Sequence, residues 1–261
     1  MPAMDHCGSE PSALPSNSHD TGVKLYLELM KRCLLNEIYP ELEMSVKKYQ
    51  VSDRQEGREW PAGAHTMIGR KRLDNIQFCI EDILKHEVPG DLMETGVWRG
   101  GAIIFMRSVL QAYGISDRVV WGADSFCGLP PPKEEYPADN GSWLHECPEL
   151  SVPLDEVKAN FQKYGLLDEQ VRFLPGFFSA TLPAAPMQQL SLIRLDGDLY
   201  ESTLVAMEHL YPKLSIGGYL IVDDYVLPPC RQAITDYRIK CGITEDILPI
   251  DWAGVFWQRV S

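Results

Sequence analysis

The sequence predicts an α/β fold in which a doubly wound, mostly parallel sheet follows an N-terminal helical lid. From residue 91 onward, short apolar runs alternate with amphipathic stretches. This alternation is typical of a parallel sheet with helices on both faces. Glycines follow the first apolar run, and acidic residues follow the second, fourth and fifth. In a doubly wound sheet, ligands bind beyond the carboxyl ends of the strands, so these residues are the first candidates for a site.

The composition excludes several classes of protein. The 261 residues are 45% hydrophobic and 23% charged, which is typical of one large or two small globular domains. Acids outnumber bases 37 to 24, so nucleic acid and anionic membranes are not expected as partners. There is no signal-peptide pattern and no apolar stretch near the roughly 18 residues of a membrane span. Seven scattered cysteines without a C-x-x-C pair indicate reduced thiols in a cytoplasmic protein and no zinc site.

The chain divides into three parts. Residues 1–22, rich in Ser, Pro, His and Gly, are expected to be a disordered tail. Residues 23–90 form a helical and lid region, with amphipathic helices over 24–38 and 67–86 and a loop or lid over 39–65. Residues 91–261 form the core.

The core is predicted element by element from its periodicity. Strands are expected over residues 91–97, 119–126, 171–176, 190–198 and 219–225. Helices are expected over residues 101–114, 154–165, 202–214 and 230–243. The final segment, DILPIDWAGVFWQRV, can form a strand pair.

The ends of the first two strands suit an adenosine-type ligand without a pyrophosphate. The first is followed by ETGVWRGG (94–101), whose glycine spacing differs from that of a dinucleotide site. Glu94, just ahead of the glycines, suits a cationic amino group, although the segment could be an ordinary strand–helix turn. Asp124, at the end of the second strand, is placed to bind ribose hydroxyls. The alternative for Asp124 is a helix cap or turn residue.

The fourth and fifth strands end in two acids each, in the segments LDGD (195–198) and VDDY (222–225). If the strands are neighbours, four carboxylates converge, which is costly unless a cation neutralises them. Carboxylates suit Mg²⁺ or a related hard cation. The alternative is that each acid caps a helix or pairs with a base such as Arg194.

Several motifs together resemble one family. ETGVWRGG, DSFCGLPPP, LDGDLYEST, LYPKLSIGGYLIVDDY and the upstream AHTMIGRKRLDN are similar to motifs of the macrocin O-methyltransferase family. These bacterial enzymes methylate sugar hydroxyls of macrolide and aminocoumarin antibiotics. The resemblance runs from about Tyr26 to the end of the chain. It implies a Rossmann-like class I methyltransferase fold, S-adenosylmethionine and Mg²⁺ as cofactors, and a glycosylated small molecule of secondary metabolism as substrate.

The resemblance also implies roles for particular residues. Asp196, Asp223 and Asp224 would bind the metal. The cofactor would contact Thr66, Met67, Glu94, Gly96, Gly100, Asp124, Ser125, Phe178 and Ser179. One departure is visible, since the family often has aspartate where this sequence has Ala180. The resemblance suggests that the N-terminal element closes the acceptor pocket, and relatives of this kind form dimers or larger assemblies, so a homo-oligomer is expected.

Methylating a hydroxyl requires removal of its proton. Asp198 is the candidate general base beside Asp196, because in an extended segment residues two apart point to the same side. His145, in the polar loop over 130–150, is the rival base, or else merely an exposed histidine. Candidate substrate contacts are Glu37, Glu41 and His145, with Trp60 and Trp143 as aromatic walls; a solvated helix end is the alternative for the two acids.

Other functions compete with sugar O-methylation. The acceptor could be a non-sugar vicinal diol or a catechol-like small molecule, with the same metal chemistry. A binding protein without turnover is another class, although all four acids are present. The absence of Gly-x-Gly-x-x-Gly disfavours a nicotinamide oxidoreductase.

Overall fold

The computed structural model describes residues 16–39, 51–59 and 62–261. Its strands are β1 (Asp91–Thr95), β2 (Val120–Asp124), β3 (Val171–Pro175), β4 (Leu190–Leu195), β5 (Leu214–Val222), β6 (Leu248–Pro249) and β7 (Val255–Gln258). Its α-helices are α1 (Ser16–Leu34), α2 (Val51–Glu56), α3 (Arg70–Lys85), α4 (Gly101–Ala112), α5 (Leu154–Lys163), α6 (Phe178–Thr181), α7 (Tyr200–Leu210) and α8 (Pro228–Cys241). Short 3₁₀ helices lie at Pro137–Asp139, Leu144–Glu146, Pro148–Leu150, Leu182–Ala184 and Tyr211–Lys213.

The seven strands form one sheet in the order β3-β2-β1-β4-β5-β7-β6. Strands β1 to β5 are parallel, and β7 is antiparallel to both β5 and β6. The order reverses direction between β1 and β4, which makes this the switch point of a doubly wound sheet. The predicted fold class is confirmed.

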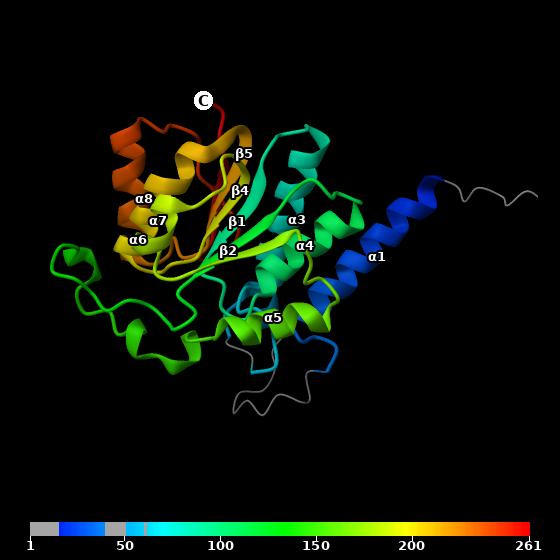
Figure 1. Ribbon diagram of the computed structural model, residues 1–261, viewed down its shortest axis with the longest axis horizontal. Coiled ribbons are helices and arrows are strands. Elements are labelled where there is room, and N and C mark those ends of the chain that lie inside the picture. Colours follow the sequence, from blue (N-terminus) through cyan, green and yellow to red (C-terminus); the bar gives the residue numbers. More distant parts are fainter. Residues whose placement is uncertain (1–15, 40–50, 60–61) are drawn as a thin grey trace, which may run out of the picture.

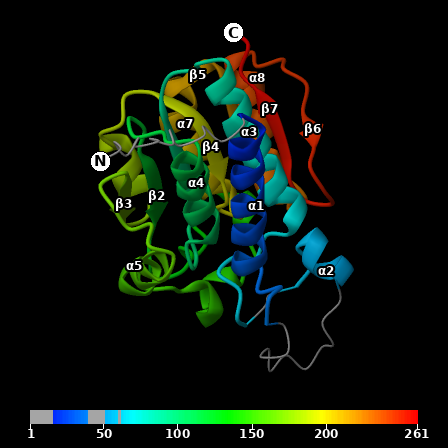
Figure 2. The same cartoon turned by 90° about the vertical axis from the view of Figure 1, so that its right-hand side faces the viewer.

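Two hydrophobic clusters hold helices to the two faces of the sheet (Figure 1). Successive strand residues point to opposite faces, so Leu92 and Leu192 belong to one cluster while Met93 and Ile193 belong to the other. The first cluster packs α1, α3, α4 and α5, and the second packs α7 and α8. Figure 2 shows α1 lying against α3 and α4. The N-terminal helices therefore share the core of the sheet. No helix in the described part of the chain is long and apolar enough to cross a membrane.

The structure corrects several expected boundaries, among them the end of α1 at Leu34 rather than at residue 38. Helix α1 begins at Ser16, so residues 16–22, predicted as part of the tail, are helical. These residues carry no large apolar side chain, so the apolar periodicity that predicts the helix starts only after them. Helix α7 ends at Leu210, ahead of Pro212, and β5 starts at Leu214 rather than at residue 219. Pro212 has no N–H to donate to a carbonyl oxygen one turn earlier, so the α-helical hydrogen bonds stop there and the chain continues as the 3₁₀ turn Tyr211–Lys213.

A short helix interrupts the segment that was predicted to be a loop or lid. Helix α2 has little apolar surface, and a buried charged residue anchors it instead. The side chain of Arg54 is 2% exposed, donates to the carbonyl oxygen of Leu35, and its Nε lies 2.6 Å from Glu59 Oε1. An apolar periodicity cannot reveal an element held in this way.

Candidate active site

The strand ends predicted to carry the site meet at one level of the sheet. Thr95 of β1 pairs with Ala123 of β2 and with Leu195 of β4. Leu195 pairs in turn with Val222 of β5. The residues that follow in these four strands are Gly96, Asp124, Asp196 and Asp223. The parallel register therefore brings the predicted glycine turn and the predicted acids to one edge.

Gly96 allows the backbones of β1 and β4 to approach closely at this edge. Its φ is 84°, and a Cβ atom there would lie 1.6 Å from the carbonyl oxygen of Asp196. Any side chain would force the two strand ends apart. The close packing of the two strand ends therefore requires glycine at this position. Gly96 also lines the smaller of the two cavities described next.

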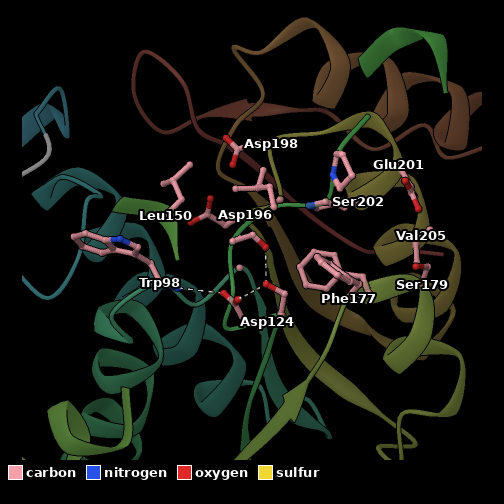
Figure 3. Close-up of a pocket in the computed structure, with 18 of the residues that line it drawn as sticks. Trp98, Asp124, Leu150, Phe177, Ser179, Asp196, Asp198, Glu201, Ser202 and Val205 are labelled. Atoms are coloured by element: carbon pink, nitrogen blue, oxygen red, sulfur yellow. Dashed lines mark hydrogen bonds between the residues drawn. The ribbon is translucent and has the colours of Figure 1, made fainter. Parts of the chain in front are cut away.

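Two adjoining cavities open at this edge. The smaller, of about 230 Å³, is lined by residues that include Asp124, Ser125, Phe177, Phe178, Ser179 and Glu201. The larger, of about 530 Å³, is lined by residues that include Thr66, Arg72, Glu94, Trp143, Asp223, Asp224, Leu227 and Trp252. Both are lined by Met67, Gly96, Trp98, Leu150, Asp196 and Asp198. Figure 3 shows Asp196 and Asp198 on one side of the smaller cavity, with Asp124 across from them.

Asp124 binds the glycine turn of β1 with its side chain. Its Oδ2 accepts from the amides of Val97 and Trp98 at 2.6 and 3.3 Å, and its Oδ1 accepts from the amide of Phe126 at 2.7 Å. Asp124 therefore acts as a turn residue, which was the alternative to a ribose contact. Burial raises the pKa of this carboxyl, and the amide hydrogen bonds oppose that rise. Since Asp124 also lines the smaller cavity, a ribose contact remains a prediction.

The predicted metal ligands come together in space. Each of Asp196, Asp223 and Asp224 offers one carboxylate oxygen, and the three oxygens lie within 4.8 Å of one another. The amide of Asp198 donates to Asp224 Oδ2 at 3.2 Å. Asp198 is not extended as predicted, because β4 ends at Leu195 and Asp198 has a φ of 56°. Aspartate tolerates this left-handed conformation better than most residues, and Asp198 still lines both cavities.

Two buried arginines neutralise part of the acidic cluster. The guanidinium of Arg194 contacts Glu94, Asp196 and Asp223. Arg72 of α3 contacts Asp223 and lies 2.7 Å from Asp251. Asp196 and Asp223 are therefore paired with basic residues, which was the alternative to metal binding. Two guanidiniums face six carboxyl groups, namely Glu94, Asp196, Asp198, Asp223, Asp224 and Asp251.

The incomplete neutralisation changes the pKa values in the cluster. Burial, together with repulsion from Asp196 and Asp223, raises the pKa of Asp198 to about 7. Burial also raises the pKa of Asp224 well above its usual value, again with repulsion from its neighbours. The pKa of Asp223 is instead lowered, because Arg194 and Arg72 outweigh the effect of burial. Burial raises the pKa of Glu94 to about 8 despite Arg194.

Three predicted residues line neither cavity, and two more lie outside the described residues. Gly100 lines neither cavity; its φ of 91° and its place before α4 make it the residue that begins that helix. His145 lines neither cavity and lies 3.7 Å from Glu146. Glu37 is 3.4 Å from Arg70 and also lines neither. Glu41 lies outside the described residues, as does Trp60.

The structure adds residues that the sequence analysis missed. Arg72 lies on the buried face of α3 with Leu73 and Ile76, and a basic residue on an apolar face is a usable signal. Trp252 lines the larger cavity, and its indole nitrogen donates to the carbonyl oxygen of Glu56 at 2.7 Å. Nothing local in the sequence indicates that contact, since the two residues are far apart in the chain.

The comparisons with known proteins agree with this geometry. The family model described as macrocin-O-methyltransferase (TylF) matches residues 23–259. The chain belongs to the macrocin O-methyltransferase family. It is 53% identical over 243 residues to the 8-demethyl-8-(2,3-dimethoxy-alpha-L-rhamnosyl)-tetracenomycin-C 4'-O-methyltransferase of Streptomyces olivaceus, covering 91% of this chain and 93% of the relative. It is 51% identical to the demethyldecarbamoylnovobiocin O-methyltransferase of Streptomyces niveus, covering 90% and 93%.

Solved structures place this macrocin O-methyltransferase family member in the same fold group. The structure of the O-methyltransferase NovP has a TM-score of 0.89 at 51% identity, covering 92% of this chain and 100% of NovP. The calicheamicin methyltransferase CalS11 has a TM-score of 0.60 at 17% identity, covering 98% and 99%, which supports the fold alone. The protein is therefore an O-methyltransferase.

Proposed function

We propose that this O-methyltransferase transfers a methyl group from S-adenosylmethionine to a sugar hydroxyl of a glycosylated natural product, with Mg²⁺ held by Asp196, Asp223 and Asp224. The observation that carries the proposal is a pair of adjoining cavities with the acidic cluster at their junction. The names of the relatives support the acceptor class, since they act on a rhamnosylated tetracenomycin, a novobiocin precursor and mycinamicin III.

The residues present fit S-adenosylmethionine. The smaller cavity is lined by Asp124 and Ser125 after β2 and by Phe177, Phe178 and Ser179 around the start of α6, and this combination of polar and aromatic groups suits a nucleoside. Glu94 lines the larger cavity, and its Oε2 is buried without a hydrogen-bond partner among the described residues. A buried acceptor of this kind suits the cationic amino group of the methionine part.

The acidic cluster also fits a divalent cation. Its donors are hard carboxylate oxygens, close enough together to share one ion. Burial raises the pKa values of Asp196, Asp198 and Asp224, and repulsion among the neighbouring acids adds to that rise. A bound cation would relieve that repulsion, which supports Mg²⁺ at this edge.

The chain's own residues then have distinct tasks in the reaction. When bound, S-adenosylmethionine supplies the methyl group and Mg²⁺ lowers the pKa of the acceptor hydroxyl. Asp198, at the junction of the cavities, accepts the proton from that hydroxyl. Arg194 holds the carboxylates of Asp196 and Asp223 in place. Trp98 and Leu150 line both cavities and exclude water around the reacting atoms.

Calorimetric binding of S-adenosylhomocysteine, with Mg²⁺ and with a chelator, tests the cofactor part of the proposal. We expect micromolar binding in both conditions. Methylation of a panel of glycosylated acceptors is expected with Mg²⁺ and not with the chelator. Folded protein that binds neither S-adenosylhomocysteine nor S-adenosylmethionine would contradict the proposal, and turnover unaffected by the chelator would contradict its metal part.

The acidic cluster predicts how stability depends on pH. The pKa values of Asp198 and Glu94 are raised to about 7 and about 8, so between about pH 6 and pH 8 the folded protein holds protons that the unfolded chain has lost. In chelator, the free energy of unfolding should therefore decrease by about 4 kcal/mol over this range. Urea titrations at the two pH values measure this change. Mg²⁺ should stabilise the protein more at the higher pH, and a stability that rises with pH in chelator would contradict the assignment.

A further inference from the structure

The loop over residues 126–152 lines both cavities and must be held in place for either to have its shape. Pro130, Pro131 and Lys133 face the smaller cavity, and Asn140 and Trp143 face the larger. The loop contains only short 3₁₀ turns, so its own backbone hydrogen bonds do not fix it to the sheet. Contacts with other elements must therefore set its position.

One such contact joins the loop to the start of α7. Asp139 is 2% exposed, and its Oδ1 and Oδ2 accept from the amides of Tyr200 and Glu201 at 2.6 and 3.0 Å. The first amides of a helix need an acceptor from outside the helix, and a side chain just before the helix usually provides it. In α7 that position is Leu199, which has no side-chain acceptor. Asp139 provides it from 61 residues away.

Neighbouring contacts reinforce this junction. Lys133 of the loop forms an ion pair with Glu201 of α7, and the rings of Tyr136 and Tyr200 lie 6.0 Å apart. The segment directly before α7 is Asp196–Leu199, which carries a predicted metal ligand and the candidate base. The far end of the loop is held separately, because the indole nitrogen of Trp98 donates to the carbonyl oxygen of Glu149 at 2.8 Å.

We propose that Asp139 is a positioning residue of this methyltransferase: its carboxylate docks the loop over residues 126–152 on the start of α7. It thereby aligns the walls of both cavities with the segment that carries Asp196 and Asp198. The inference rests on the proposed use of the smaller cavity for the cofactor. Asp139 lines the larger cavity, but both of its carboxylate oxygens accept from amides of α7, so an effect of its replacement on cofactor binding acts through the loop.

The cofactor binds only to molecules in which the loop is docked on α7. Loss of docking therefore raises the apparent dissociation constant of the cofactor. When only part of the molecules are binding-competent, the apparent dissociation constant rises by the inverse of that fraction. Losing a helix cap of this kind corresponds to a change of about tenfold in such an equilibrium. We therefore expect Asp139→Ala to raise the dissociation constant of S-adenosylhomocysteine by up to about tenfold, the full factor applying when the docked state is the minor one.

The experiment combines calorimetry with amide hydrogen exchange on the full chain. Asp139→Ala should weaken S-adenosylhomocysteine binding and speed exchange across residues 126–152, and saturating ligand should restore slow exchange there. Asp139→Asn keeps one acceptor and should give an intermediate effect, which also covers the case that the alanine variant folds poorly. Asp155→Asn, an exposed carboxylate in the first turn of α5, is the control and should match the wild type.

The outcomes separate the two proposals. Wild-type protein that fails to bind S-adenosylhomocysteine contradicts the proposed function. Wild-type binding together with unchanged binding and unchanged loop exchange in both Asp139 variants overturns the positioning role. Faster exchange in α7 alone, with unchanged binding, also overturns it, because Asp139 would then only stabilise that helix.

Discussion

Asp224→Asn is expected to abolish Mg²⁺ binding and to lower methyl transfer by about a thousandfold or more, while S-adenosylhomocysteine binding is retained. The metal contribution is worth several kcal/mol at the transition state, which corresponds to a factor of this size. Asp224 is the most informative ligand to change. Its pKa is raised by burial and by its acidic neighbours, so asparagine removes a repelled charge and keeps an acceptor for the amide of Asp198. Folding in chelator should therefore be unimpaired.

Asp223 is a poorer choice for the same test. Its carboxylate contacts both Arg194 and Arg72, so its removal would leave two buried guanidiniums short of a partner. A loss of activity would then mix metal loss with structural damage. Asp224 has no ion pair with a base among the described residues, and its replacement isolates the metal ligand.

Asp198→Asn is the matched comparison for Asp224→Asn. Asparagine is also tolerated at a φ of 56°, so the backbone turn should persist. Loss of a general base lowers the rate by about a hundredfold to ten-thousandfold. Mg²⁺ titration by calorimetry and single-turnover rates should show metal binding retained in Asp198→Asn and lost in Asp224→Asn. Equal metal affinity in both variants would contradict the ligand assignment, and a wild-type rate for Asp198→Asn would remove Asp198 as the base.

Arg194→Met is expected to lower the free energy of unfolding by about 3–5 kcal/mol, which is a large fraction of the stability of a domain. Arg194 is 1% exposed and contacts Glu94, Asp196 and Asp223 at the ends of three neighbouring strands. Methionine nearly preserves the volume but removes every donor, so three carboxyl groups lose a shared cation. Urea unfolding measures the loss.

The Arg194 prediction includes a pH dependence and a control. The loss should shrink at lower pH, because protonation of Glu94 and Asp196 neutralises the unpaired acids. Lys240→Met removes the exposed ion pair with Glu208 and should cause no measurable change. A loss below about 1 kcal/mol for Arg194→Met would show that the acids do not depend on this arginine.

Local patterns in the sequence were enough to predict the succession of strands along the chain, their alternation with helices and the residues at the strand ends. These follow from local patterns: period-two and helical periodicities identify the elements, and the edge at which parallel strands end is the same for all of them. This is why the sequence predicts that Gly96, Asp196, Asp223 and Asp224 lie at the same edge of the sheet. The motifs in the same segments indicated the family.

The partners of the charged side chains, in contrast, depend on the folded arrangement of distant elements. Arg72 reaches Asp223 from a helix 151 residues earlier, and Asp139 caps a helix 61 residues later. No periodicity carries such information, because these contacts depend on how separate elements pack. The turn at Asp198, the anchoring of α2 by Arg54 and the absence of His145 from the lining of either cavity belong to the same class. Local patterns determine where helices and strands begin and end. A buried charge, in contrast, is costly unless it is paired, and its partner comes from an element far away in the chain.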